Sequence, residues 1–308
     1  MPPMPRFDIL GFGAVAVDEL LYVDQYPAAE AKVRVRERRR QCGGLTGTAM
    51  VAAARLGARC AYVGMLGDDE LSRFAADALA REGIDLTHCV RRADARPAYS
   101  TIIVDHTHNT RTIFACVEGP IGPDESLPEE ALIRAARVLL VDHHGVEGTL
   151  RAVRIARQAG VGVVADVERD PGGPFAELLS AVDHLIVSQR FARELSGADD
   201  PAEAARRLWT PSRQAVVVTC GSAGCWYADA TTGDEPRHFP AFAVEVADTT
   251  GCGDVFHGVY AAGLAAGENL RQRITLATAA AAIKATRQGG QAGCPTRREI
   301  DEFLRSRV

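Results

Sequence analysis

Residues 138–164 read VLLVDHHGVEGTLRAVRIARQAGVGVV, and this stretch decides the fold. It opens with the apolar run Val138–Val141 and closes with a second run, Val161–Val164. Each run is short and apolar on both faces, as is typical of parallel strands that are covered by helices. Because Leu150–Gln158 between them reads as a helix, the stretch predicts a strand, a crossover helix and a second, parallel strand.

The same alternation continues on both sides of this unit. Further buried strands are expected at Leu185–Val187 and Val216–Thr219, with a helix over Ala202–Leu208. Towards the N-terminus, Phe7–Val17 is expected to form one strand, and apolar residues at helical spacing over 71–79 predict an amphipathic helix. We therefore expect an α/β fold with a doubly wound, mostly parallel sheet, and ligands at the carboxyl ends of its strands.

Two segments interrupt this pattern. Residues 33–38 (Val-Arg-Val-Arg-Glu-Arg) alternate apolar and charged side chains, the period of a strand with one solvated face. Tyr99–Val104 and Thr112–Val117 read as a hairpin. These half-exposed strands predict a small β lid, built discontinuously from about residues 20–42 and 97–118.

The composition is that of a water-soluble globular protein with a small-molecule partner. A chain of 308 residues, 47% of them hydrophobic, can bury a large core, and we expect one domain over residues 1–308. The net charge of −5 gives no basic surface for nucleic acid. No apolar stretch is long enough to suggest a membrane span or a secretory signal. Eight cysteines without any C-x-x-C pair argue against a zinc motif and fit a reducing cytoplasm.

The strongest chemical signal is Asp248-Thr-Thr-Gly-Cys-Gly-Asp254, which follows the strand-like segment Phe242–Val246 and opens an apolar helix. Gly251 and Gly253 allow a ligand to approach the main chain closely. The free N–H groups and the dipole of a helix start attract phosphate. A carboxylate at this place, that of Asp254, suits removal of a proton from an attacking hydroxyl. The alternative is that Asp254 only caps the helix.

A second glycine-rich stretch is Gly43-Gly-Leu-Thr-Gly-Thr48, which leads into the helical segment Ala49–Leu56. It is not a P-loop, because no Gly-Lys-Ser/Thr follows the glycines. Gly11-Phe-Gly-Ala-Val-Ala16 has the spacing G-x-G-x-x-A, which in a dinucleotide-binding fold requires a helix directly after it. The segment that follows does not read as a helix, so that interpretation is set aside.

Taken together, these motifs resemble the ribokinase-like (PfkB-type) carbohydrate kinases. The resemblance covers essentially the whole chain, and it rests on four motifs in order: Gly43–Gly57, Gly64–Asp69, Thr219–Gly224 and Asp248–Asp254. Within the family, the C-terminal third is most similar to sulfofructose kinases, and parts of the middle are similar to ketohexokinase. All four motifs together favour the base over the cap as the role of Asp254.

The resemblance implies an ATP-dependent kinase that phosphorylates a primary hydroxyl of a sugar, either a ketose or a sugar derivative. Asp254 would be the general base, and the amides of Gly251, Cys252 and Gly253 would form an anion hole with it. The implied substrate-binding residues include Asp18, Gly43, Gly44 and Thr48. The implied ATP-binding residues are Thr219, Gly221, Gly224, Thr249, Gly289 and Gly290. ATP with Mg²⁺ is expected, and so is a monovalent cation near Asp248.

The identity of the substrate stays open. Lys32 and His144 are candidates to bind an anionic substituent of a sugar, the first as a fixed charge and the second as a charge that depends on pH. The alternative is a solvated Lys32 and a His144 that bonds to backbone. A nucleoside kinase of the same fold is a rival reading, with Phe114 as a platform for the base. A non-catalytic sugar-binding regulator is another, because a fold does not fix a function.

Two further expectations concern the metal and the assembly. Many relatives carry Asn-x-x-Glu where this chain has Ser188-Gln-Arg-Phe191, so no metal-binding residue is assigned. The lid resembles one that pairs two subunits in the family, and a small sheet with an exposed edge is marginally stable by itself. We therefore expect a homodimer, with a shared face formed by Val33, Val35, Ile102, Val104 and Phe114.

Overall fold

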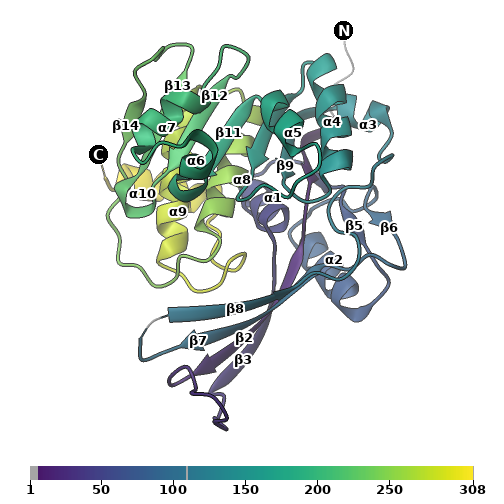
Figure 1. Cartoon of the computed structure of the whole chain (residues 1–308), viewed down its shortest axis with the longest axis vertical. Helices are drawn as coiled ribbons and strands as arrows, with labels where there is room; N and C mark the ends of the chain where they lie inside the picture. Colours follow the sequence, from purple (N-terminus) through teal and green to yellow (C-terminus); the bar gives the residue numbers. More distant parts are fainter. Residues whose placement is uncertain (1–5, 109, 308) are drawn as a thin grey trace.

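The computed structural model describes residues 6–108 and 110–307, in which a second, smaller sheet projects from an eight-stranded central sheet (Figure 1). All neighbours from β4 to β12 are parallel, and β13 and β14 are added antiparallel at one edge. The predicted, mostly parallel sheet is confirmed. In spatial order its strands are β14 (Arg237–Phe239), β13 (Cys225–Asp229), β12 (Ala215–Thr219), β11 (His184–Ser188), β10 (Gly162–Asp166), β9 (Ala136–Asp142), β1 (Phe7–Phe12) and β4 (Cys60–Tyr62).

Helices cover both faces of this sheet. Val138 and Leu140 of β9 belong to one core cluster, and Leu139 and Val141 belong to another on the opposite face, because successive strand residues point to opposite sides. The sheet is therefore doubly wound, as predicted. The first cluster includes residues of α1 (Leu45–Arg55), α2 (Glu70–Arg81), α8 (Cys252–Ala265), α9 (Leu270–Ala285) and α10 (Arg297–Arg305). The second includes residues of α3 (Glu130–Arg134), α4 (Val146–Gln158), α5 (Phe175–Ala181), α6 (Gln189–Ser196) and α7 (Pro201–Leu208).

The N-terminal apolar run is two strands, and the prediction of a single strand over Phe7–Val17 is wrong. The chain leaves β1 at Phe12 and enters β2 (Ala16–Val23), which belongs to the smaller sheet. The break falls at Gly13, where a side chain would collide with the carboxylate of Asp142. The run therefore connects the two sheets.

The smaller sheet is formed by the two segments that were predicted to make a lid, and we call it the lid. Its order is β3-β2-β7-β8, where β3 is Glu37–Gly43, β7 is Ala98–Asp105 and β8 is Thr110–Cys116. The predicted hairpin is confirmed, because β7 and β8 pair antiparallel. The expected strand over residues 33–38 is wrong in its position: β3 begins only at Glu37, which pairs with Tyr22 as the last residue pair between β3 and β2. The Arg36 amide still donates to the Tyr22 carbonyl of β2 over 2.8 Å, but residues 31–35 form no strand.

The register of the lid separates residues that were expected to share one face. Ile102 pairs with Ile113, whereas Phe114 pairs with Thr101, so Ile102 and Phe114 point to opposite faces. Ile102 is 4% exposed and Phe114 is 54% exposed. The predicted set for subunit pairing is therefore wrong in Ile102 and in Val104, which lies on the same face as Ile102. Phe114 is on the outer face.

Residues 242–246, read above as strand-like, are not a strand. The backbone of the chain just after them bonds to a helix end, since the Ala247 and Asp248 amides both donate to the Ala285 carbonyl, over 2.8 and 3.1 Å. Two short strands, β5 (Met65–Leu66) and β6 (Val90–Arg91), pair beside the main sheet. Within the described ranges, no helix is both long and apolar enough for a membrane crossing.

Candidate active site

The motif Asp248–Asp254, called the signature motif from here on, leads into the first turn of α8, which begins at Cys252. Gly251 caps this helix with φ of +77°, a left-handed conformation that glycine adopts readily. A Cβ atom at Gly251 would lie 3.1 Å from the Gly290 Cα, so two glycine-rich segments touch here. At Gly253, by contrast, a Cβ atom would meet no atom within 4 Å, and the space beside the helix start is open. The Cys252 amide donates to the Thr249 carbonyl over 3.2 Å, so it closes a turn instead of standing free.

Asp254 lies among other acidic side chains. Burial raises the pKa of Asp254 well above its ordinary value, and the carboxylates of Asp166 and Glu168 raise it further. Asp142 and Asp18 contribute in the same direction. Carboxylates that share one site disfavour each other's charged form. The structure therefore brings Asp18 and Asp254, which are far apart in the sequence, into one electrostatic site, and a carboxylate with a raised pKa suits a general base.

A buried histidine supports the first turn of α8 from the side of the sheet. The Nδ1 of His257 lies 2.7 Å from the Gly253 carbonyl, and its Nε2 lies 3.1 Å from the Ile186 carbonyl of β11. Asp166 Oδ2, at the end of β10, is 3.2 Å from the same Nδ1. Sequence reasoning missed both side chains. For Asp166 the available signal was its place at the carboxyl end of a buried parallel strand, where ligands are expected.

The predicted substrate residues Asp18, Gly43 and Gly44 come together where β2 meets β3. Asp18 accepts side-chain hydrogen bonds from Ser100 and Gln41, while burial raises the pKa of its carboxyl. Asp18 Oδ2 would be 2.6 Å from a Cβ atom on Gly43. Gly44 has φ of +87°, and a Cβ atom there would lie within 2.7–2.8 Å of the backbone of residues 14–16. Glycines here let the backbone close around the carboxylate.

Thr48 is buried beside the anion hole. Its Cγ2 would lie 3.4 Å from a Cβ atom on Gly251, so α1 and the signature motif are in contact at this point. The structure therefore places Thr48, one of the predicted substrate residues, next to Gly251.

His144 and Lys32, the two candidates for an anionic substituent, are not brought together. The His144 amide donates to Asp142 Oδ1 over 2.8 Å, and its Nδ1 is 3.2 Å from the same oxygen. Lys32 is exposed in the connection between β2 and β3, at the tip of the lid, far from α4, whose start adjoins His144 (Figure 1). The structure thus ties His144 to a buried carboxylate and leaves Lys32 in solvent.

Asp142 is a further acidic residue that sequence reasoning missed. Its Oδ2 accepts hydrogen bonds from the Ala14 amide (2.7 Å) and from Thr46 Oγ1 (2.9 Å). Burial opposes ionisation, but the hydrogen bond and the charge of His144 outweigh it and lower the pKa of Asp142. Asp142 therefore joins β9, the link between the sheets and the start of α1, behind the substrate residues.

The residues expected at the nucleotide lie around two loops. Thr219 ends β12, and Gly221 begins a 3₁₀ turn (Gly221–Ala223) after it. Gly224 has φ of +89°, and a Cβ atom there would lie 2.7 Å from the Ala241 amide nitrogen. Glycine is required at this position because two chain segments pass so closely.

The second of these two loops, which carries Gly289 and Gly290, contacts the signature motif directly. The Gly289 amide donates to Asp248 Oδ2 over 2.9 Å, and Gly290 packs against Gly251. Thr249 is exposed beside them. The predicted residues of this loop therefore do lie next to the first turn of α8.

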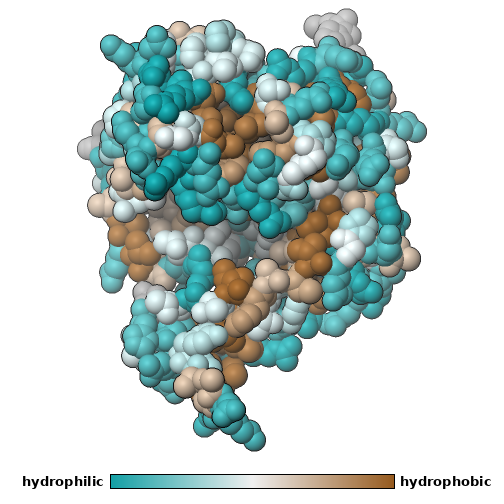
Figure 2. Space-filling view, in the orientation of Figure 1, coloured by the Kyte–Doolittle hydropathy of each residue, from teal (hydrophilic) through white to brown (hydrophobic). Residues whose placement is uncertain are grey.

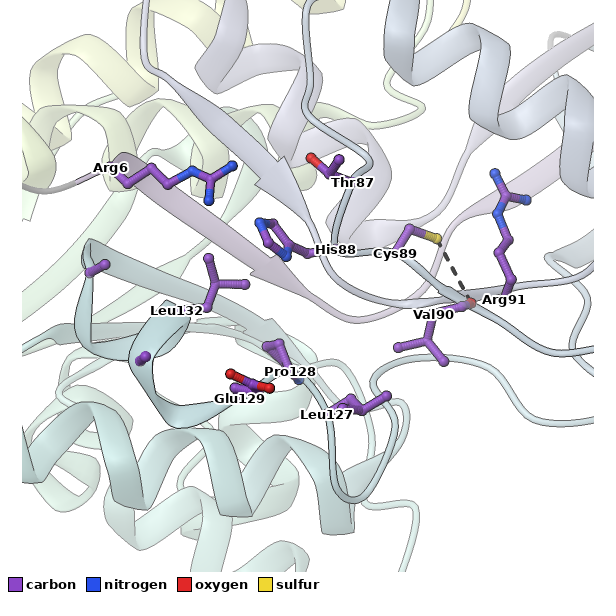
Figure 3. Close-up of a pocket in the computed structure, with 12 residues that line it drawn as sticks. Arg6, Thr87, His88, Cys89, Val90, Arg91, Leu127, Pro128, Glu129 and Leu132 are labelled. Atoms are coloured by element: carbon purple, nitrogen blue, oxygen red, sulfur yellow. Dashed lines mark hydrogen bonds between the residues drawn. The ribbon is translucent and has the colours of Figure 1, made fainter.

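The lid closes over this region. A cavity of about 320 Å³ lies between the lid and the segment before α8. It is lined on the lid side by Leu20, Tyr22 and Ile102 and on the other side by residues 246–250. Figure 2 shows this side of the molecule hollowed between the α/β body and the lid. A larger cavity of about 710 Å³, with Arg6, His88 and Leu132 around it (Figure 3), lies instead by the amino end of β1. Its position is opposite to that expected for ligands in a parallel sheet.

The acidic residues near Asp254 fit a metal ion that arrives with a nucleotide. Within the described part of the chain, no three His, Cys, Asp or Glu side chains form a group suited to hold a metal by themselves. Asp166 Oδ2 is buried, and although His257 Nδ1 lies 3.2 Å away, no donor among the described residues forms a hydrogen bond to it. Mg²⁺ commonly binds through one or two carboxylates together with phosphates and water. Asp166 and Asp254 suit such a shared site.

Fold and site together define a class of protein. A doubly wound α/β body places Asp254 at a helix start, between Asp18 on one side and the glycine-rich loop of Gly289 and Gly290 on the other, which is the arrangement expected of a ribokinase-like phosphotransferase. The chain belongs to the pfkB family of carbohydrate kinases, whose family model matches residues 8–297. It is an ATP-dependent carbohydrate kinase.

Individual relatives agree with this assignment. The chain is 28% identical to a ribokinase of Haemophilus influenzae over 309 residues, which cover 95% of this chain and 96% of the relative. It is 28% identical to fructokinase-1 of Oryza sativa subsp. japonica over 324 residues, covering 97% and 98%. A crystal structure from Agrobacterium tumefaciens, provisionally assigned as a ribokinase, superposes with a TM-score of 0.91 at 30% identity and covers 97% of this chain and 98% of the other.

Proposed function

We propose that this kinase transfers the γ-phosphoryl group of ATP to a primary hydroxyl of a sugar, either a ketose or a sugar derivative, with Asp254 as general base. The observation that carries the proposal is the position of Asp254 in the first turn of α8, in the electrostatic field of Asp18 and next to the Gly289–Gly290 loop. A hydroxyl bound by Asp18 and a phosphate at the helix start would then meet at Asp254.

In the proposed reaction Asp254 takes the proton of the attacking hydroxyl. The hydroxyl oxygen forms a bond to the γ-phosphorus, and the bond from that phosphorus to the bridging oxygen of ADP breaks. The helix dipole and the amides around Gly251 and Gly253 stabilise the negative charge on the transferring group. When bound, Mg²⁺ neutralises charge on the polyphosphate, and Asp166 and Asp254 are the side chains that fit it.

A neutral sugar fits the site better than an anionic sugar or a nucleoside. Asp18, with Ser100 and Gln41 beside it, offers oxygen and amide groups suited to hydroxyls. The connection between β2 and β3, which carries Lys32, lies far from the start of α4, which adjoins His144 (Figure 1), so these two side chains are not placed to bind one anionic substituent together. Phe114, the candidate platform for a nucleobase, is on the outer face of the lid. The similarity to a ribokinase and a fructokinase supports the same choice. Eight free cysteines are consistent with action in a reducing cytoplasm.

A coupled assay of ADP release tests this proposal. Fructose, its 6-sulfonated analogue, ribose and a set of nucleosides are compared by kcat/KM, with the variant Asp254→Asn as control. Loss of a general base costs about 10²–10⁴-fold in rate, and we expect that loss in kcat while ATP binding is kept. More than a tenth of the wild-type kcat in the variant would exclude the role of Asp254 as base. Faster use of nucleosides or of the sulfonate would overturn the neutral-sugar assignment.

A further inference from the structure

Lys284, in the last turn of α9, is a fully buried cation beside the active site. Its side chain is 0% exposed. The Nζ donates hydrogen bonds to the Asp248 carbonyl over 2.7 Å and to the Arg287 carbonyl over 3.1 Å. Asp248 Oδ2 is 3.9 Å from the same nitrogen. Buried charges are costly unless they are paired, and here oxygen atoms from two segments surround the ammonium.

The chain segment that packs against the Lys284 side chain leaves room for it at Gly293. A Cβ atom on Gly293 would lie 2.6 Å from Lys284 Cδ and 3.1 Å from its Cε, so a glycine is needed for the lysine stem to pass. The chain has 35 Lys and Arg residues, of which only Lys32 and Lys284 are lysines. Lysine ends in a compact ammonium whose donors rotate, whereas arginine ends in a wide, planar group. The space beside Gly293 and the Asp248 carbonyl therefore accommodates a small cation such as the lysine ammonium.

The ammonium connects the two loops that meet at the phosphate side of the site. Asp248 opens the signature motif, and its carboxylate accepts hydrogen bonds from the Thr250 amide (2.8 Å) and the Gly289 amide (2.9 Å). Arg287 precedes Gly289 in the nucleotide loop. Lys284 thus fixes the backbone of both loops with a single positive charge behind the anion hole.

This arrangement does not fit the monovalent cation expected near Asp248. Such an ion would need the same carbonyl and carboxylate oxygens that already face the Lys284 ammonium. We infer that Lys284 is a built-in cation that takes the place of a bound monovalent metal ion, so that the enzyme needs no added potassium. The inference goes beyond the proposed function, because it concerns how the phosphate side of the site is held and not which sugar reacts.

Binding of ADP and thermal melting of the wild-type protein give the first test. Both are measured in potassium chloride and in tetramethylammonium chloride at equal ionic strength, since tetramethylammonium is too large for such a site. We expect the same dissociation constant and the same melting temperature in both salts. Tighter ADP binding or a higher melting temperature in potassium would overturn the inference. Neither readout needs turnover, so failure of the sugar assay would leave this result unaffected.

Two variants separate the charge of Lys284 from its volume. Lys284→Ala removes the charge and opens space, whereas Lys284→Met removes the charge and fills the space. In tetramethylammonium both are expected to bind ADP more weakly, by roughly ten- to a hundredfold, as when a group that orients a charged site is lost. Potassium or ammonium should restore binding in the alanine variant but not in the methionine variant.

The matched control is Arg298→Ala, which removes an exposed charge of α10 that pairs with Glu302 on the same helix. It should bind ADP like the wild type in both salts. Undiminished binding by Lys284→Ala, or a lack of rescue by potassium and ammonium, would overturn the inference. If the alanine variant does not fold, the salt comparison on the wild type still decides.

Discussion

Arg111 Nη1, on the lid strand β8, donates a hydrogen bond of 2.7 Å to Thr250 Oγ1 in the signature motif. The same nitrogen lies 3.6 Å from Asp248 Oδ1. Register places Arg111 on the same face of the lid as Ile102 and Val104, the face that lines the cavity over the site. A side chain from the lid therefore holds the loop that precedes the anion hole.

Replacing Arg111 by alanine should weaken this closure. We expect the KM for ATP to rise by roughly tenfold, because a charge-assisted hydrogen bond contributes about 1.5–3 kcal/mol. Steady-state kinetics with ATP as the varied substrate measure the effect. The control is Arg154→Ala, which removes an exposed arginine paired with Glu177 on the far side of the body. Equal effects of the two variants would show that the contact between Arg111 and Thr250 has no role.

The raised pKa of Asp254 makes a prediction about stability. A carboxyl whose pKa is higher in the folded than in the unfolded state destabilises the fold once pH rises above its unfolded value, and the penalty is complete above the folded pKa. Asparagine cannot ionise and avoids this penalty. Asp254→Asn should therefore melt higher than the wild type at pH 8, by about 2–4 °C for each kcal/mol. The difference should vanish near pH 4.

Thermal melting of both proteins between pH 4 and pH 8 shows whether the variant or the wild type has the higher melting temperature. Asp301→Asn, at a half-buried position of α10 where the carboxylate pairs with Arg297, is the comparison. A melting temperature for Asp254→Asn that is lower than that of the wild type at pH 8 would contradict a raised pKa.

Two glycines of α8 should respond differently to the same substitution. A side chain at Gly253 would extend into open space beside the anion hole, so Gly253→Val should lower kcat/KM by roughly 10²-fold through misplaced phosphate and leave melting nearly unchanged. A side chain at Gly258 would collide with the Ala49 carbonyl of α1. Gly258→Val should therefore lose about 1–3 kcal/mol or more of folding stability. Kinetics and thermal melting of both variants distinguish a loss of activity from a loss of stability. A large loss of melting temperature in Gly253→Val would contradict the prediction for Gly253.

The outer face of the lid gives a prediction about assembly. β8 is an edge strand whose residues are all exposed, and Phe114 lies on its outer face. Exposed edges with apolar side chains favour pairing with another chain. We predict a homodimer at micromolar concentration and a monomer for Phe114→Glu, measured by light scattering. A wild-type mass equal to that of one chain would refute this prediction.

The buried parallel strands were predictable from the sequence because their signal is local. Val138–Val141 and Val216–Thr219 are apolar on both faces, and only a strand between two helical layers buries both. The strand boundary within residues 7–17 was not predictable, since apolar character continues across it. It depends on Gly13 meeting Asp142, a residue far along the chain. Residues 33–38 have the period of a strand, but a strand needs a partner, and β2 pairs only as far as Glu37.

The sequence by itself determined the class of fold and predicted the place of the chemistry, because glycines and an aspartate at a helix start carry their signal in local backbone geometry. Only the tertiary structure decided which distant side chains act on that place: Asp166 and His257 beside Asp254, Arg111 on Thr250, and Lys284 behind Asp248. The physical reason is that electrostatic and hydrogen-bonding effects depend on separation in space. Residues that end different strands of a parallel sheet become neighbours only when the sheet is assembled.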